Sequence, residues 1–276
     1  MELSRPIIKA SPLHRAKIYC RVNTQYPKIS IITPSYNQGD FIEKTIQSVL
    51  NQNYPNLEYI IIDGGSKDNS VDIIKKYEKN LTYWVSEKDN GQSEALNKGF
   101  KKASVEIIAW INSDDWYEGN VFEIVANYFR NSGASIIAGN CKMIYEGAAE
   151  KNFIDKPGKI TSIRMLQYWK PFFCPPQPSI FFKNEALEKA GYINETLSYG
   201  MDLDLWLRLS KKYKFKYVDI LFANYLIHDA SKSGSSNGFE KFVPEWKSVV
   251  KSRLNDFSFF TKFIYWILKR TNHVVE

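Results

Sequence analysis

Two patterns of apolar and polar positions alternate through the first half of the chain. Short β-branched apolar runs, such as residues 28–36 (KISIITPSY), precede segments in which apolar residues return every three or four positions, such as residues 40–52 (DFIEKTIQSVLNQ). The first pattern predicts strands and the second predicts amphipathic helices. The pair recurs in residues 57–80, 81–103 and 105–131. Such alternation predicts an α/β fold of the Rossmann-like kind, with a mainly parallel sheet flanked by helices.

The second half is less regular. Residues 134–145 are predicted to form a long strand or hairpin, and residues 175–193 a strand followed by a helix. Residues 201–213 (MDLDLWLRLSKKY) predict an amphipathic helix, and residues 214–228 two more strands. From Gly238 the chain is predicted to be helical, basic and aromatic.

We therefore expect three parts. Residues 1–27 form an N-terminal extension without periodicity, residues 28–237 form the main domain, and residues 238–276 form a C-terminal helical tail. With 44% hydrophobic and 24% charged residues, the composition is that of a globular protein.

The charge and the cysteines narrow the class of protein. A net charge of +7 favours anionic partners, but the basic residues do not gather in one strand or helix, so we expect no nucleic acid. Cys20, Cys141 and Cys174 lie far apart, which argues against a zinc site or a disulfide scaffold. No signal peptide or run of ~20 apolar residues appears. We expect a cytoplasmic protein that can lie peripherally on the inner face of the cell membrane.

Polar clusters follow the four predicted strands of the first half. They are residues 33–37 (TPSYN), 63–68 (DGGSKD), 86–92 (SEKDNGQ) and 112–115 (NSDD). Parallel sheets bind ligands at the carboxyl ends of their strands, so these clusters predict one site at that edge. The chain lacks GxxxxGK[ST] and has no GxGxxG after its first strand, which excludes a P-loop and disfavours a dehydrogenase-type dinucleotide site.

Asp114 and Asp115 are adjacent acids at the end of a buried strand. Oxygen ligands in that position suit Mg²⁺ or Mn²⁺, whose shell is completed by water and substrate phosphates. The alternative is that they cap a helix beginning near Glu118. Asp63 also ends a strand, and Gly64 and Gly65 after it would let a flat ring approach the backbone. The alternative for Asp63 is a plain turn aspartate.

Asp202 and Asp204 open the helix of residues 201–213. Asp202 is a candidate general base, with an N-cap as the alternative. Asp204 is expected to pair with Arg208 at i,i+4 on an exposed helix face. His228 ends a predicted strand and is either a metal or phosphate contact or an ordinary surface or core histidine.

Together these segments resemble the family-2 glycosyltransferases of the GT-A fold. The resemblance spans about Lys28 to Ser233 and is carried by residues 29–70, 86–100, 111–115 and 177–209. It implies an inverting transfer of a sugar from a nucleotide-diphosphate sugar, with a UDP-sugar expected, to a hydroxyl of a glycan or lipid-linked acceptor. Such reactions build polysaccharides and cell-surface glycans, and the implied cofactor is a divalent cation, Mn²⁺ or Mg²⁺.

The resemblance also implies roles for residues on the nucleotide side. Thr33 and Asp63 would contact the nucleobase, and Tyr36 and Asn37 would shape the same pocket. Asp89 would line the nucleotide site.

At the reacting end, the motif of Asp114 and Asp115 resembles the metal-binding DxD-type motif. Asp115 would bind the metal, and Asp114 would bind the ribose or the metal. Asp202 matches the base that deprotonates the acceptor hydroxyl, and His228 matches a histidine near the diphosphate and the metal.

Two positions depart from the family pattern. Asn112 stands where many relatives carry the first acid of the metal motif, and Met201 where they carry a glutamate before the base. These changes leave open a nucleotide- or glycan-binding relative without catalysis. A third alternative is a nucleotidyltransferase on a similar sheet. Such an enzyme requires a glycine-rich basic loop after the first strand, and residues 33–40 (TPSYNQGD) lack one.

The tail carries an aromatic stripe. On a helix over residues 256–270, Phe259, Phe260, Phe263, Ile264 and Ile267 share one face, with Lys262, Lys269 and Arg270 at its flanks. Such a helix predicts either contact with a membrane surface, which suits a lipid-linked acceptor, or packing against the core or a second copy.

Overall fold

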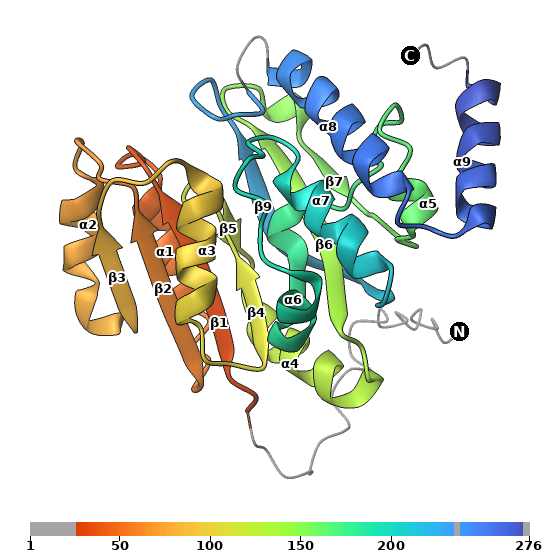
Figure 1. Ribbon diagram of the computed structural model, residues 1–276. Coiled ribbons are helices and arrows are strands. Elements are labelled where there is room, and N and C mark those ends of the chain that lie inside the picture. The colour runs from red at the N-terminus through yellow and green to blue at the C-terminus, as the bar shows by residue number, and fades with distance from the viewer. Residues whose placement is uncertain (1–25, 235–237, 273–276) are drawn as a thin grey trace, which may run out of the picture.

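The computed structural model describes residues 26–234 and 238–272. Within them a nine-stranded sheet is flanked by helices, in the strand order β3-β2-β1-β4-β8-β6-β9-β5, with β7 paired to β6 (Figure 1). The strands are β1 (Ile29–Ser35), β2 (Leu57–Asp63), β3 (Tyr83–Ser86), β4 (Ile107–Trp110), β5 (Trp116–Tyr117), β6 (Ile136–Tyr145), β7 (Phe153–Asp155), β8 (Ile180–Lys183) and β9 (Phe215–Ile227). The helices are α1 (Ile42–Leu50), α2 (Ser70–Lys76), α3 (Gln92–Lys102), α4 (Val121–Ser132), α5 (Ser162–Met165), α6 (Asn184–Ala190), α7 (Met201–Ser210), α8 (Gly238–Leu254) and α9 (Phe259–Thr271).

The first four long strands form the parallel half of the sheet. β1 pairs in parallel with β2 and β4, and β2 pairs in parallel with β3. Successive residues of a strand face opposite sides of the sheet. Accordingly, Ile31 packs in the same core cluster as residues of α1 and α4, whereas Ile32 packs in the cluster that includes residues of α3 and α7. The predicted repeat of strand and helix is confirmed here, and it leaves the strand ends free to form a site.

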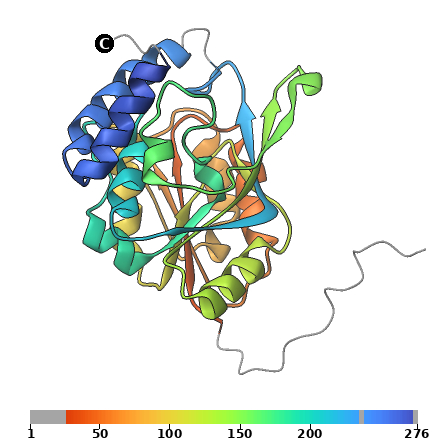
Figure 2. The ribbon, with the colours of Figure 1, turned by 90° about the vertical axis from the view of Figure 1, so that its right-hand side faces the viewer.

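The other half of the sheet is mixed. β8 lies antiparallel between β4 and β6, while β6 and β9 run parallel to each other. Residues 214–228 form one long strand where the sequence predicted two. The chain passes an irregular stretch of pairing near Asn140 without turning back. Figure 2 shows β6, β7 and β9 rising at one side of the molecule, away from the C-terminal helices.

The C-terminal residues are helical, as predicted, and pack on the body of the protein. Val249 and Val250 of α8 are buried in the core cluster that also holds the apolar residues of α7. The ring of Tyr265 of α9 lies 5.6 Å from the ring of Trp169, at an interplanar angle of 56°. In the described residues no helix has the length and apolarity that a membrane crossing requires. The predicted extension of residues 1–27 falls almost entirely outside the described part of the chain.

Candidate active site

A cavity of about 1050 Å³ opens at the carboxyl ends of the parallel strands. All four polar clusters of the sequence reach its wall, through Tyr36 after β1, Gly64 after β2, Asp89 after β3 and Asp114 after β4. The start of α7 closes the far side with Asp202. The predicted convergence of these loops on one edge is therefore observed.

Two of the predicted nucleotide contacts lie behind the cavity wall. Thr33 is fully buried, and its hydroxyl is 3.1 Å from the hydroxyl of Tyr59. Asp63 is also fully buried and accepts hydrogen bonds from the backbone N–H of Ser66 at 2.9 Å and from the Ser86 hydroxyl at 2.6 Å. In this structure Asp63 thus organises the loops that end β2 and β3.

Asn37 ties the first two loops together. It adopts the left-handed conformation at φ 52°, which asparagine tolerates better than most residues. Its backbone N–H donates to Ser66 Oγ, and its Oδ1 accepts from the backbone N–H of Lys67, both at 2.8 Å. Tyr36 beside it is 59% exposed and lines the cavity. Tyr36 is therefore placed to contact a ligand, whereas Asn37 shapes the loop around it.

Asp89 faces the cavity and packs against the glycine turn after β2. It accepts a hydrogen bond from the Gly91 N–H at 2.9 Å, and burial raises the pKa of its carboxyl. A Cβ atom at Gly64 would lie 2.8 Å from the Asp89 carboxylate. Glycine is required there because the two loops approach so closely.

Three further residues of the wall were not selected as site residues from the sequence. Ser35 Oγ, Gln38 Oε1 and Gln177 Oε1 are buried without a hydrogen-bond partner in the described residues, and all three residues line the cavity. Buried polar atoms are nearly always paired, so these atoms are available to a ligand. Ser35 lies within the TPSYN cluster and Gln38 directly follows it, so both could have been selected with it, but nothing local distinguishes Gln177.

Asp114 lines the cavity after β4, and behind it lies His228, which follows β9 and is buried. Asp114 Oδ2 lies 3.2 Å from His228 Nε2, and this hydrogen bond raises the pKa of the imidazole. The imidazole ring packs at 4.2 Å from Phe41, which fixes its plane. A carboxylate and an imidazole are a suitable partial ligand set for Mn²⁺. No cluster of three or more histidine, cysteine or acidic residues suited to a metal occurs in the described ranges, so a cation here would need substrate oxygens and water as well.

Asp115 faces the other way. It is 1% exposed, accepts from the Leu226 N–H at 3.0 Å and the Asn112 side-chain amide at 3.3 Å, and does not line the cavity. Burial raises its pKa well above the usual range. The helix-capping alternative for the two acids is wrong, because α4 begins at Val121 after Asn120.

Asp202 opens into the cavity from the first turn of α7. The helix begins at Met201, so Asp202 is its second residue and not its N-cap. Burial raises the pKa of the Asp202 carboxyl to about 6. Met201 faces α3, where its sulfur accepts a hydrogen bond from the Ser93 hydroxyl at 3.0 Å.

Asp204, two residues further along, does not reach the cavity. It is 1% exposed and accepts from Arg208 Nε at 2.9 Å and from Arg253 Nε of α8 at 2.6 Å. The expected pairing with Arg208 is confirmed, but the expectation of an exposed helix face is wrong. The helix packs under α8, which the local sequence around Asp204 does not reveal.

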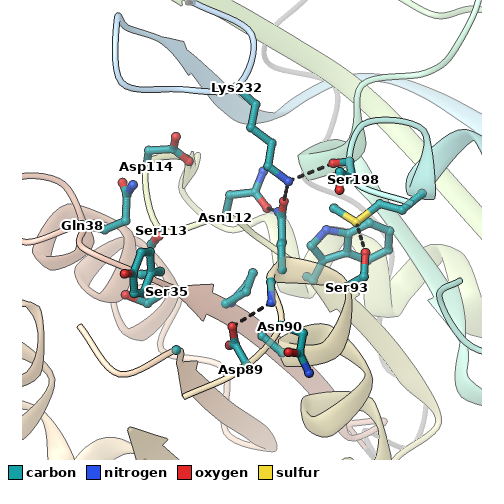
Figure 3. A pocket seen from close by; sticks show the side chains of 18 of the residues that line it. Ser35, Gln38, Asp89, Asn90, Ser93, Asn112, Ser113, Asp114, Ser198 and Lys232 are labelled. Carbon is teal, nitrogen blue, oxygen red and sulfur yellow. Dashed lines mark hydrogen bonds between the residues drawn. The ribbon is translucent and has the colours of Figure 1, made fainter. Parts of the chain in front are cut away.

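Lys232 crosses the mouth of the cavity. Its ammonium group donates to Gln92 Oε1 at 2.8 Å and to the Ser198 carbonyl at 2.9 Å (Figure 3). In the same view Asp114 and Gln38 lie on the opposite side of the cavity. The site therefore holds a cation on one wall and an acid on the other.

Comparisons with known proteins assign the family. Residues 30–191 match the model of glycosyl transferase family 2. An uncharacterized glycosyltransferase of Rickettsia typhi is 27% identical over 83% of this chain and 73% of its own length. A GalNAc(5)-diNAcBac-PP-undecaprenol beta-1,3-glucosyltransferase of Campylobacter jejuni is 28% identical over 73% of this chain and 65% of its own length. Curated relatives such as these are longer than the match, and the chain spans between 32% and 73% of their length.

Solved structures agree on the fold. Residues 1–349 of TarS of S. aureus, in complex with UDP-GlcNAc, align with a TM-score of 0.69 at 18% identity, over 86% of this chain and 70% of that solved chain. A mannosyltransferase of Pyrobaculum calidifontis, in complex with GDP-Man and Mn²⁺, aligns with a TM-score of 0.57 at 16% identity, over 91% of this chain and 80% of that protein. The chain belongs to glycosyl transferase family 2 and has a GT-A-like fold.

Proposed function

We propose that this member of glycosyl transferase family 2 moves a sugar from a nucleotide-diphosphate sugar to an acceptor hydroxyl, with inversion at the anomeric carbon. The observation that carries the proposal is the shared cavity of Asp114 and Asp202. Asp114 lies beside His228 at the strand ends, and Asp202, at the start of α7, has no ion-pair partner among the described residues. A donor diphosphate and an attacking hydroxyl need two such positions.

The donor would occupy the side of the cavity formed by the loops after β1, β2 and β3. Tyr36 and Asp89 line it, and Ser35 and Gln38 offer unpartnered polar atoms to the nucleotide. Thr33, Asn37 and Asp63 would act from behind by holding these loops. A UDP-sugar is the expected donor, in line with the UDP-GlcNAc bound by TarS.

A divalent cation, Mn²⁺ or Mg²⁺, would be held by Asp114 with His228, and not by Asp115. This choice follows from the side chains, because Asp114 lines the cavity while Asp115 is buried behind it. When bound, such a cation stabilises the charge that develops on a departing diphosphate. Lys232, on the opposite wall, carries a further positive charge toward the same space.

Asp202 would act as the general base. In the proposed step the acceptor oxygen forms a bond to the anomeric carbon as the bond from that carbon to the diphosphate oxygen breaks. The acceptor proton moves to the Asp202 carboxylate, and the nucleoside diphosphate leaves. A carboxyl pKa of about 6 suits this role, because the group is ionised at neutral pH yet more basic than an ordinary aspartate.

The acceptor would be a glycan or a lipid-linked sugar in cell-surface glycan biosynthesis. The Campylobacter relative is named for an undecaprenol-linked substrate, which supports a lipid-linked acceptor here. A protein that works on such a substrate has to reach a membrane surface.

Helix α9 offers the chemistry for that contact. Its outer side carries Phe259, Phe260 and Phe263, which are 82%, 69% and 53% exposed, together with the half-exposed Trp266 and Ile267. This group, the aromatic face of α9, lies at the edge of the molecule away from β1–β3 (Figure 1). Exposed apolar stripes of this kind mark interaction surfaces.

The charge of the chain favours an anionic bilayer as the partner. The net charge is +7, and Lys262 and Arg270 lie on the same helix as the aromatic face. Aromatic side chains that enter the interface between basic residues are typical of helices that rest on anionic lipid.

The nucleotide site is tested by thermal shift. UDP, GDP and CDP are added with and without Mn²⁺, and we expect UDP to stabilise the protein more when the cation is present. Asp114→Asn should abolish the metal-dependent part of the shift, while Asp115→Asn should alter the melting temperature alone. Asp72→Asn, at an exposed acid of α2 that does not line the cavity, is the matched control. A full metal-dependent shift in Asp114→Asn would overturn the assignment.

Turnover separates an enzyme from a binding protein. Asn112 and Met201 keep open a relative that binds nucleotide without transferring sugar. Release of UDP from the UDP-sugar that stabilises the protein most is measured with polyprenyl-diphosphate-linked and free glycan acceptors. Binding without release, across the whole acceptor set, would favour the non-catalytic reading.

The membrane surface is tested with vesicles. Replacing Phe259, Phe260 and Phe263 by serine should weaken co-sedimentation with phosphatidylglycerol vesicles about tenfold or more at low salt. Serine at Ile154 and Ile220, exposed apolar residues elsewhere, is the matched control. If the α9 variant instead changes the oligomeric state and binds vesicles as before, the aromatic face joins two copies of the chain.

A further inference from the structure

Helix α8 holds the loop that precedes the proposed base. The Glu245 carboxylate accepts hydrogen bonds from three consecutive backbone N–H groups, those of Ser198 at 3.1 Å and of Tyr199 and Gly200 at shorter distances. Asp202 follows two residues after the last of them. A single carboxylate therefore fixes both the path of this loop and the start of α7.

The loop has no anchor of comparable strength within its own sequence. The N-cap of α7 is Gly200, which has no side chain to accept a hydrogen bond from the helix, and the residue before Asp202 is the uncharged Met201. A Cβ at Gly200 would lie 3.3 Å from Val249 and 3.5 Å from Glu245 Oε2, so α8 packs tightly over this turn. The anchoring charge comes from a helix beyond residues 30–191, the region matched by the family model.

Glu245 also acts on Asp202 through its charge. The charged groups that face Asp202 are Glu245 of α8, which raises the pKa of Asp202, and Lys232 of the loop after β9, which lowers it; burial is the largest cause of the upward shift. The titratable neighbours Cys174 and Tyr225 are neutral at pH 7 and are themselves buried.

We propose that Glu245 is a positioning residue for sugar transfer: α8 supplies the carboxylate that orients the first turn of α7 and with it the base, Asp202. The proposal rests on the function proposed above, in which Asp202 takes the acceptor proton. It also places α8 in the active site, although residues 238–276 were predicted from the sequence to form a separate C-terminal tail. Phe242, one helical turn before Glu245, lines the same cavity and packs at 5.0 Å from Tyr199.

Substitution of Glu245 tests its charge first. Glu245→Gln removes the negative charge and keeps one acceptor oxygen, whereas the carboxylate uses one oxygen for Ser198 and the other for Tyr199 and Gly200. The pKa of Asp202 should fall, so the acid limb of the kcat/KM profile should move to lower pH, and kcat should fall a few-fold because the base is weaker. Glu240→Gln, an exposed acid on the same helix, should leave the profile unchanged.

Removing the acceptor altogether tests the orienting role. Glu245→Ala should lower kcat about tenfold or more and raise KM for the acceptor, while affinity for the nucleotide, measured by thermal shift, stays at the wild-type value. An acid limb that stays in place in Glu245→Gln, with kcat unchanged, would overturn the proposal even if the variant is less stable. Failure of the proposed function looks different, because Asp202→Asn would then remain active and the wild type would show no acid limb near pH 6.

Discussion

Helix α7 carries one aspartate on each of two opposite sides, and the two carboxylates have different surroundings. Asp202 faces the cavity with no ion-pair partner in hydrogen-bond contact among the described residues, and its carboxyl pKa is raised to about 6. Asp204 faces α8, where two guanidinium groups, from Arg208 and Arg253, each donate to one of its oxygens. The residues are two positions apart, which is about 200° around a helix.

This difference shows how one helix can both stabilise the fold and supply a reactive group. A buried carboxylate whose two oxygens each accept a hydrogen bond from a guanidinium group is tied into the fold and is not open to an acceptor hydroxyl. A carboxylate that is desolvated and unpaired lowers stability at neutral pH but becomes more basic. Substitution on each side should therefore produce opposite changes in activity and stability.

The largest effect is expected for activity on the cavity side. Asp202→Asn keeps the size of the side chain but cannot take a proton, so turnover should fall by about 10²–10⁴-fold while nucleotide affinity barely changes. Steady-state kinetics and nucleotide titration measure the two quantities. If Asp204→Asn is the inactive variant at full stability, the base has been assigned to the wrong side of the helix.

The next largest effect is expected for stability on the α8 side. Asp204→Asn removes the counter-charge of Arg208 and the nearer of the two acids that pair with Arg253, which should cost about 3–5 kcal/mol of unfolding free energy. Urea unfolding measures it. Asp72→Asn removes an exposed acid that pairs with Lys75 at 3.9 Å, and should cost about 0–1 kcal/mol. Equal losses in the two variants would contradict the comparison.

A smaller and opposite effect is expected for stability on the cavity side. The pKa of Asp202 is about 6 in the folded protein against 3.8 for an ordinary aspartate, so the folded state binds the proton more tightly than the unfolded state. Stability therefore falls as the pH rises from about 4 to about 6, and the loss is complete above that range. At pH 7.5 the free energy of unfolding of Asp202→Asn should exceed that of wild type by about 1–3 kcal/mol. The gain should shrink toward zero near pH 4, and a constant gain at both pH values would point to a cause other than the charge.

The strand and helix pattern of the first half was predictable because it depends on short-range periodicity. Residues 28–131 alternate between short continuous apolar runs and segments with a 3.6-residue repeat, and the observed elements from β1 to α4 follow this alternation. The second half was less predictable. Apolar runs such as β8 and β9 indicate burial, but they do not encode which strand pairs with which, or in which direction.

The site was predictable at the level of loops and less so at the level of side chains. Strand ends followed by polar clusters located Tyr36, Asp89 and Asp114 in the cavity wall. The same reasoning could not tell Asp114 from Asp115, because adjacent residues in a turn point in different directions and the Leu226 N–H that binds Asp115 comes from a distant strand.

The sequence by itself determined the alternation of strands and helices, the edge at which polar residues gather and the family of the chain. It could do so because periodicity, turn residues and motif spacing are local properties. Only the tertiary structure decided that Glu245 anchors the turn before Asp202 and that Arg253 pairs with Asp204. Both contacts join α7 to a helix some forty residues away, and they exist because α8 packs its apolar side, with Val249 and Val250, over α7. Which polar groups meet in such an interface depends on how two helices are docked, and no local pattern in either helix specifies that geometry.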